Sequence, residues 1–235
     1  MIGLFDSGRG GENTLEAIRE ISPLADIIFL ADRENAPYGI RNEEELVRLS
    51  ICHIDRMSAL GADKILIGCC TASTVYQLLP EKYKRLSIPI VEPIANAARA
   101  ATKAKRIGVA ATERTVRSHA FARKLDGCEV YELALQELVG FIDGGMSDAS
   151  MSPDNREYLN RILSPLFTLG IDTLILGCTH FPAVADTVRD IVSAHGSIAV
   201  IDSAREGALA LVKEFPECAI GNGRIIRLES KKILI

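Results

Sequence analysis

The sequence predicts an α/β protein of two similar doubly wound parallel-sheet domains. Short apolar runs alternate with segments of helical spacing along most of the chain, which is typical of parallel sheets covered on both faces. Two of these runs nearly repeat each other: Asp63–Cys69 (DKILIGC) and Asp172–Cys178 (DTLILGC) both end in Gly-Cys. Because open α/β sheets place their chemistry outside the carboxyl ends of the strands, the repeat predicts one thiol at the edge of each sheet.

A second repeat favours a duplication. Ile2–Ser7 (IGLFDS) resembles Ile107–Thr112 (IGVAAT), and their first residues lie 105 positions apart, while Cys69 and Cys178 lie 109 positions apart. Similar offsets for two motifs indicate two related βα units in tandem, which we expect to be arranged as a pseudo-twofold pair.

The expected strands are short runs of β-branched and aliphatic residues, bounded by glycine or polar residues. They are Ile2–Phe5, Ile27–Leu30, Lys64–Ile67, Ile90–Val91, Arg106–Val109, Glu129–Leu133, Thr173–Leu176 and Ala199–Ile201. Helical spacing is found in Glu43–Leu60, Glu113–Lys124, Arg156–Leu169 and Ala183–His195. Near the end of the chain, Arg224–Leu228 is expected to be a short edge strand. We expect a first domain of residues 1–93 with 205–235, a second of residues 94–204, and a hinge near Pro89–Pro93.

The composition is that of an ordinary globular protein with a core of useful size: 235 residues, 48% hydrophobic and 25% charged. The formal net charge is −4 and spread along the chain, so it does not point to nucleic acid or an anionic membrane as partner. No apolar stretch approaches membrane length, and a strand that begins at Ile2 leaves no room for a leader peptide. We therefore expect a cytoplasmic protein whose six cysteines are reduced thiols.

The segment Asp6–Gly11 (DSGRGG) follows the first expected strand and opens a helix. It lacks the spacing of a dinucleotide-binding motif, because Asn13 stands where the third glycine is required. Glycines at a helix N-terminus also suit a small carboxylate, which the backbone N–H groups hold by hydrogen bonds. Taken alone, the segment favours a simple turn in which Asp6 or Ser7 caps the helix.

The matched positions of Cys69 and Cys178 give both residues a chemical interpretation. A lone cysteine at a strand end is usually a small buried hydrophobic residue. Two thiols that point at one molecule from opposite sides suit the transfer of a proton from one face of a carbon to the other. Helix N-termini and protonated histidines lower the pKa of a thiol from its ordinary value of about 8.5. His180, two residues after Cys178, and Asp6, beside Cys69, are the expected acid–base partners.

Five separated motifs together carry a resemblance to a known family. They are Asp6-Ser7-Gly8-x-Gly10-Gly11, Pro37-Tyr38-Gly39, Cys69-x-Thr71-Ala72-Ser73, Thr112-Glu113-x-Thr115-x-Arg117-Ser118 and Gly177-Cys178-Thr179-His180-Phe181-Pro182. In this order and with this spacing, they resemble glutamate racemase, of the cofactor-independent aspartate/glutamate racemase superfamily. The resemblance runs from Ile2 to about Ala208, and the Cys-Thr-His ending of the last motif favours the glutamate branch.

The resemblance implies two α/β domains, an active site between them and no pyridoxal phosphate or other cofactor. It implies that Cys69 and Cys178 are the two bases, that Asp6 assists Cys69 and that His180 assists Cys178. A further acidic residue of the family falls on Asp143, at a position that is usually Glu. The residues that the resemblance places around the substrate are Ser7, Pro37, Tyr38, Gly39, Cys70, Thr71 and Thr179.

Cys70 departs from the family, which normally has Asn directly after the first catalytic cysteine. A thiol is a poor hydrogen-bond donor and acceptor beside a carboxamide, so the substrate stays open. The resemblance implies a small amino acid as partner, with glutamate first and D-glutamate for bacterial cell-wall synthesis as the product. Aspartate or another small carboxylic acid is the alternative substrate, and an amino-acid-binding protein without catalysis is the alternative of another class. The oligomeric state also stays open, with a homodimer as one option.

Two further interpretations are weaker. Cys69, Cys70, Cys178 and His180 form a ligand set that zinc accepts, but paired ligand spacing is missing and adjacent cysteines seldom both bind one ion, so we expect no metal. A disulfide between the two adjacent cysteines would inactivate the protein. His53, within a helical pattern, is expected to be a partly exposed helix residue.

Overall fold

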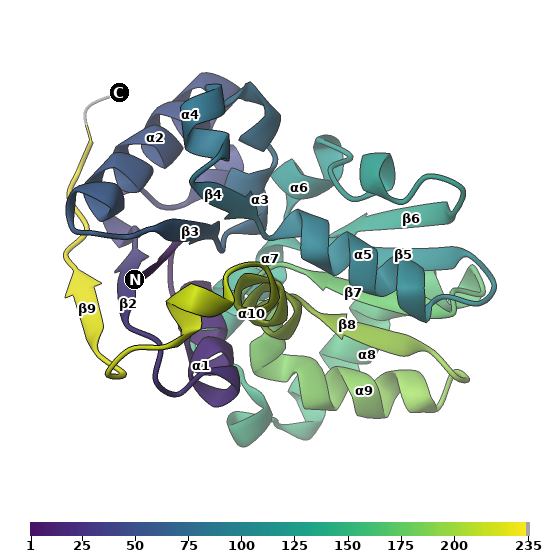
Figure 1. The fold of residues 1–235 in the computed structure, drawn as a ribbon. Coiled ribbons are helices and arrows are strands. Elements are labelled where there is room, and N and C mark those ends of the chain that lie inside the picture. Colours follow the sequence, from purple (N-terminus) through teal and green to yellow (C-terminus); the bar gives the residue numbers. More distant parts are fainter. Residues whose placement is uncertain (234–235) are drawn as a thin grey trace.

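The computed structural model describes residues 1–233, apart from the side chains of Cys218 and Ala219, and contains two parallel β-sheets. The first sheet has the strand order β4-β3-β1-β2-β9 and the second has the order β6-β5-β7-β8 (Figure 1). The strands of the first sheet are β1 (Ile2–Asp6), β2 (Ile27–Ala31), β3 (Lys64–Ile67), β4 (Ser87–Pro89) and β9 (Ile225–Leu228). Those of the second are β5 (Arg106–Ala111), β6 (Glu129–Ala134), β7 (Thr173–Gly177) and β8 (Ala199–Asp202). Two parallel-sheet units confirm the predicted fold class.

The strand orders reveal the duplication in the topology. When β1 to β4 are matched in turn with β5 to β8, both sheets run in the same order, and β9 is an additional edge strand of the first sheet. The shared Ile-Gly of β1 and β5 has a shared packing reason. A Cβ atom on Gly3 would lie 2.7 Å from Ile65, and one on Gly108 would lie 2.7 Å from Ile171. Each glycine therefore lets a neighbouring isoleucine press against the central strand.

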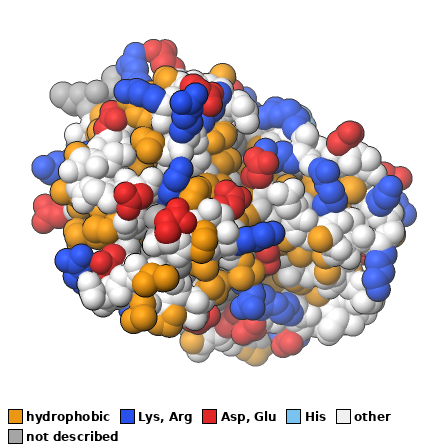
Figure 2. Space-filling model, viewed as in Figure 1, with side chains coloured by type: hydrophobic (Ala, Val, Ile, Leu, Met, Phe, Trp, Pro, Cys, Tyr) orange, Lys and Arg blue, Asp and Glu red, His pale blue; other side chains and the backbone are white. Residues whose placement is uncertain are grey.

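Ten helices cover the sheets in the part of the chain that the structure describes. They are α1 (Gly10–Ile21), α2 (Glu43–Ala59), α3 (Cys70–Ser73), α4 (Glu81–Lys84), α5 (Val91–Ala101), α6 (Glu113–Arg117), α7 (Gln136–Asp143), α8 (Pro153–Thr168), α9 (Ala185–Ser193) and α10 (Ser203–Glu214). None of them is long and apolar enough to span a membrane. On the face shown in Figure 2, acidic, basic and hydrophobic side chains are interspersed.

One apolar core continues from the first sheet to the second. It includes Leu4 and Ile175 from the two sheets, with Ile94 of α5 and Leu211 of α10 between them. Figure 1 shows these two helices at the centre of the molecule, where they pack against each other. A second core lies between the first sheet and α2, and a third between the second sheet and the pair α8 and α9. The domain boundaries predicted after residues 93 and 204 fall at the starts of α5 and α10 and stay a prediction.

Two predicted elements differ from the structure. The strand expected at Ile90–Val91 is wrong: the strand is Ser87–Pro89, and Val91 already begins α5. Pro93 is tolerated in the first turn of α5 because the first N–H groups of a helix have no carbonyl partner within that helix. The helix expected over Glu113–Lys124 breaks after Arg117 and resumes as a short 3₁₀ segment at 122–124, with His119 at a positive φ of 50° between them. The edge strand predicted at Arg224–Leu228 is present as β9.

Candidate active site

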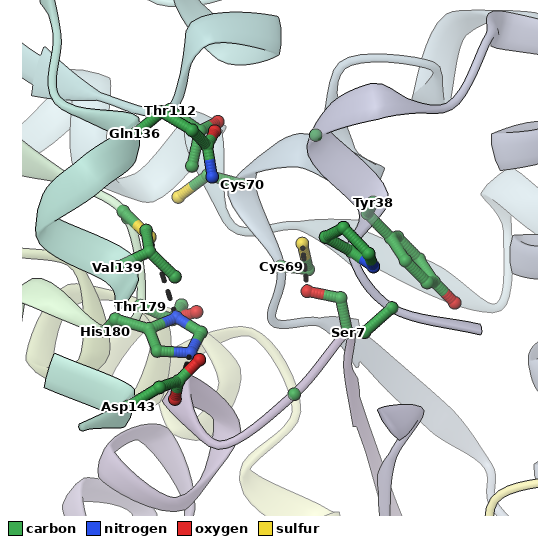
Figure 3. A pocket seen from close by; sticks show the side chains of 15 residues that line it. Ser7, Tyr38, Cys69, Cys70, Thr112, Gln136, Val139, Asp143, Thr179 and His180 are labelled. Atoms are coloured by element: carbon green, nitrogen blue, oxygen red, sulfur yellow. Dashed lines mark hydrogen bonds and ion pairs between the residues drawn. The ribbon is translucent and has the colours of Figure 1, made fainter. Parts of the chain in front are cut away.

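The predicted cleft is a cavity of about 90 Å³, small beside the few hundred cubic ångströms of a typical drug-sized ligand pocket. Its walls come from both units, mostly from residues that directly follow strands β1, β3, β5 and β7 (Figure 3). The lining residues are Ser7, Gly8, Ala36, Pro37, Tyr38, Gly39, Cys69, Cys70, Thr112, Gln136, Val139, Asp143, Cys178, Thr179 and His180. Both thiols of the repeated Gly-Cys motif therefore line one cavity.

The first thiol, Cys69, follows β3 and caps the single turn of α3. Its residue is only 4% exposed, and its Sγ lies 3.2 Å from Ser7 Oγ and accepts a hydrogen bond of 3.4 Å from the Ala72 N–H. Burial, with the negative charge of Asp6 as a second cause, raises the pKa of the Cys69 thiol to about 11. The hydrogen bonds from Ser7 and Ala72 act in the opposite direction but are outweighed.

The second thiol, Cys178, follows β7 and is 6% exposed. Its Sγ lies 3.7 Å from Nδ1 of His180, and the Nε2 of that ring lies 3.4 Å from Oδ1 of Asp143. Burial raises the pKa of the Cys178 thiol well above its ordinary range. Thiol, imidazole and carboxylate thus form a chain in which the histidine can take or return the thiol proton.

Burial decides the direction of both thiol pKa values. Backbone N–H groups after each strand do lower the two pKa values, through Ala72 at the start of α3 for Cys69 and through His180 for Cys178, but their effect is the smaller one. Removal of each thiol from water disfavours the charged thiolate and outweighs these hydrogen bonds. At neutral pH both residues are therefore held mainly as neutral thiols.

Asp6 lies behind the cavity and is completely buried. Its carboxylate accepts a hydrogen bond of 2.8 Å from the Thr179 hydroxyl and one of 2.9 Å from the Gly8 N–H. Burial raises the pKa of Asp6, although the nearby His180 and these hydrogen bonds act to lower it. Since Asp6 ends β1 and Thr179 follows β7, this contact joins the two units directly behind the site.

Tyr38 contributes its ring to the cavity wall, while its hydroxyl points away from the cavity. The hydroxyl donates a hydrogen bond of 2.6 Å to Asp32, and Nε2 of His53 lies 2.7 Å from the same carboxylate oxygen. Burial acts to raise the pKa of Asp32, but hydrogen bonds from His53, Tyr38 and Ser230 outweigh it and lower that pKa to about 2. The expectation of a partly exposed His53 is wrong, since its ring is completely buried against this network.

The tail that follows β9 holds the same wall from behind. The Ser230 hydroxyl donates a hydrogen bond of 2.7 Å to Asp32 Oδ1. Asn35, just before the wall residues, donates a hydrogen bond of 2.8 Å to the Lys231 carbonyl and accepts one of 2.9 Å from the Ile233 N–H. The tail thus contacts the loop that positions Pro37, Tyr38 and Gly39.

Of the predicted site residues, only Asp6 and Thr71 do not line the cavity. The Thr71 hydroxyl instead lies 3.0 Å from the hydroxyl of Thr112, in a buried cluster with Thr115. Five lining residues were not predicted: Gly8, Ala36, Thr112, Gln136 and Val139. Thr112 was within reach of sequence reasoning because it begins one of the five motifs. Among the described residues, no three His, Cys, Asp or Glu side chains are placed to hold a metal ion.

Comparison with known proteins gives a consistent result. The family described as Asp/Glu/hydantoin racemase matches residues 12–211. Over 219 residues, the chain is 36% identical to a glutamate racemase of Aquifex aeolicus, which covers 91% of this chain and 82% of that protein.

Solved structures agree with this comparison. A glutamate racemase isoform from Bacillus anthracis superposes with a TM-score of 0.82 at 26% identity, covering 97% of this chain and 86% of the other. The glutamate racemase of Aquifex pyrophilus gives a TM-score of 0.75 at 31% identity, covering 95% and 86%.

Proposed function

The chain belongs to the Asp/Glu/hydantoin racemase family, and on this premise we propose that it interconverts L- and D-glutamate without a cofactor, with Cys69 and Cys178 as its two bases. The observation that carries the proposal is the pair of thiols lining one cavity from separate sheets. The names of the similar proteins support glutamate as the substrate. Supply of D-glutamate for peptidoglycan precursors is the role that such an activity implies in bacteria.

In the proposed reaction, one cysteine acts as a thiolate and the other as a thiol. The thiolate takes the α-proton, so an S–H bond forms and the electron pair of the broken C–H bond moves toward the α-carboxylate. The opposite thiol then gives its proton to the other face of the carbon and becomes a thiolate. Atoms and charge balance, and the reverse direction uses the same two groups in exchanged roles.

Formation of the thiolate needs assistance, because burial raises the pKa of both thiols. At Cys178, His180 is placed to hold the thiol proton, and Asp143, 3.4 Å from Nε2, orients the ring. At Cys69, Asp6 is the nearby carboxylate, and burial raises its pKa, which favours its action as a proton acceptor and donor. Each thiol therefore has its own acid–base partner.

The identity of residue 70 favours testing a second substrate. Cys70 lines the cavity at the position where the resembled family has Asn, and its thiol cannot replace the hydrogen bonds of a carboxamide. Aspartate or another small carboxylic acid is therefore the second candidate substrate for the same two thiols.

The test is α-hydrogen exchange followed by NMR in D₂O with the reduced protein. L- and D-glutamate and both aspartate enantiomers are incubated separately, and optical activity is followed in parallel. Exchange and racemisation of glutamate support the proposal, and exchange of aspartate alone would move the activity to the second candidate. Cys69→Ala and Cys178→Ala should each abolish racemisation in both directions. Intact racemisation in either variant would contradict the two-base mechanism.

A further inference from the structure

We propose that Gln136, on the second unit, binds a carboxylate group of the substrate and thereby contributes to substrate selection. The inference rests on the proposed function, since it assumes an amino-acid substrate in this cavity. Gln136 is the first residue of α7, and its carboxamide is the only side-chain amide among the lining residues that the structure describes. In Figure 3 it lies on the same side of the cavity as Thr112 and Cys70.

The cavity must hold a carboxylate without a full positive charge from lysine or arginine. Within the described chain, none of the lining residues is Lys or Arg, and Asp143 adds a negative charge. A carboxylate that leaves water must therefore receive hydrogen bonds from neutral N–H and O–H groups or from a histidine ring. The question is which of these donors are free.

Most hydroxyl donors of the cavity are already engaged. The Ser7 hydroxyl lies 3.2 Å from Cys69 Sγ, and the Thr179 hydroxyl donates to Asp6. The Thr112 hydroxyl belongs to the cluster with Thr71 and lies 3.0 Å from its oxygen. Cys70 offers only the weak S–H donor of a thiol. These four side chains leave little capacity for a new charged ligand.

The Gln136 carboxamide, by contrast, is uncommitted. Its Oε1 is buried and has no hydrogen-bond partner among the described residues. That oxygen faces Gly39, where a Cβ atom would lie 3.0 Å from it, so the side chain bridges toward the opposite wall of the cavity. An unpaired buried acceptor carries a free-energy cost that is relieved when a donor, such as a water molecule, hydrogen-bonds to it. The amide N–H groups also make no hydrogen bond to the described residues, and they are the donors available to a substrate carboxylate.

Titration calorimetry with D-glutamate tests the proposal on the intact protein. Gln136→Met keeps the length of the side chain but removes its hydrogen bonds, and should weaken binding about tenfold or more. Gln136→Glu places a negative charge opposite the carboxylate and should weaken binding further. The matched control is Glu137→Gln, which alters the next, exposed residue of the same helix and should bind as the wild type does. Melting temperatures establish that each variant is folded.

The kinetic readout separates binding from a general structural effect. Gln136→Met should raise KM for glutamate about as much as it weakens binding and leave kcat within a few-fold of the wild type. Binding by Gln136→Met within twofold of the wild type would overturn the inference. So would tighter binding by Gln136→Glu, because that result indicates contact with the substrate ammonium group instead. Absence of both exchange and glutamate binding in the wild type overturns the proposed function as well, whereas exchange by the wild type with an unaffected Gln136→Met overturns only the role of Gln136.

Discussion

Thr179 donates a hydrogen bond of 2.8 Å to Asp6, so the carboxylate beside the first thiol is held by a residue adjacent to the second. The two acid–base sites are therefore not independent. A change at Asp6 alters the charge near Cys69 and also removes an anchor for the segment that carries Cys178 and His180.

Asp6→Asn should lower the pKa of the Cys69 thiol below its value of about 11, because the charge of Asp6 is one of the two causes that raise it. Racemisation should fall by about 10²-fold or more, since the proposed proton acceptor is lost. The pH dependence of Cys69 alkylation, read by mass spectrometry, measures this pKa. Ser7→Ala is the opposing control: it removes a hydrogen bond that lowers the same pKa, so that pKa should rise. Shifts in the same direction for both variants would contradict this electrostatic account.

His180→Asn should impair proton transfer at Cys178 more than at Cys69, because the imidazole lies 3.7 Å from Cys178 Sγ. The overall rate should fall by about 10²-fold or more. Deprotonation at Cys178 should then limit the rate for one enantiomer only. With substrates deuterated at the α-carbon, the primary isotope effect should become unequal for L- and D-glutamate, and Asp6→Asn should reverse the inequality. Equal isotope effects in both variants would indicate that neither residue serves a particular thiol.

Gly10→Ala should disturb the contact between the two units. The added Cβ would lie 2.6 Å from Thr179 Oγ1 and 2.8 Å from the backbone nitrogen of His180. Such overpacking costs about 1–3 kcal/mol, and a shift of His180 should reduce activity beyond the loss of folded protein. Thermal unfolding and kcat are the two measurements. Gly140→Ala in α7 is the matched control, because a Cβ there meets nothing within 4 Å, and it should leave stability unchanged or slightly raised.

Ser230 lies in the tail that follows β9, and Ser230→Ala should loosen the part of the cavity wall that Tyr38 forms. It removes the hydrogen bond to Asp32 Oδ1, so the pKa of Asp32 should rise from about 2. KM for glutamate should increase a few-fold with a smaller change in kcat, because Ser230 acts only by positioning the wall. Lys231→Ala is the control, since the contact of that residue with Asn35 uses its backbone carbonyl and survives the change. Equal kinetic constants for the two tail variants would show that the Ser230 hydroxyl does not position this wall.

The pKa of Asp32 also sets a pH dependence of stability. Because the folded value of about 2 lies below the ordinary 3.8, ionised Asp32 stabilises the fold above about pH 4, and this contribution is lost as the pH falls toward 2. Asp32→Asn should flatten the fall of the melting temperature over this acid range. An unchanged acid profile would show that the network of Asp32 with Tyr38 and His53 does not depend on the carboxylate charge.

Residues that directly follow a strand were predictable from the sequence. Ser7, Cys69 and Cys178 reach the cavity because parallel strands bring their carboxyl ends to one edge, and a hydrophobic run bounded by Gly-Cys is sufficient to mark that edge. The duplication was visible for the same reason, since the repeated motifs lie on strands that occupy equivalent places in the two sheets.

Features that depend on packing between distant segments were not predictable in this way. Gln136 and Val139 lie on a helix whose cavity-facing side is fixed only by how α7 meets the first unit. The burial of His53 depends on Asp32 and Tyr38. That the pKa values of both thiols are raised was also not predictable. The sequence pattern indicates the helix that follows a cysteine, but it does not indicate how far the thiol is buried from water.

The supply of one thiol by each sheet has a consequence for heat inactivation. A small rotation of one sheet against the other would separate Cys69 from Cys178 without the loss of any strand, so we expect catalysis to fail at a temperature below the melting point. A ligand bound in the cavity would contact residues of both sheets and so would stabilise their relative position. Glutamate at saturating concentration should therefore bring the inactivation temperature closer to the melting temperature.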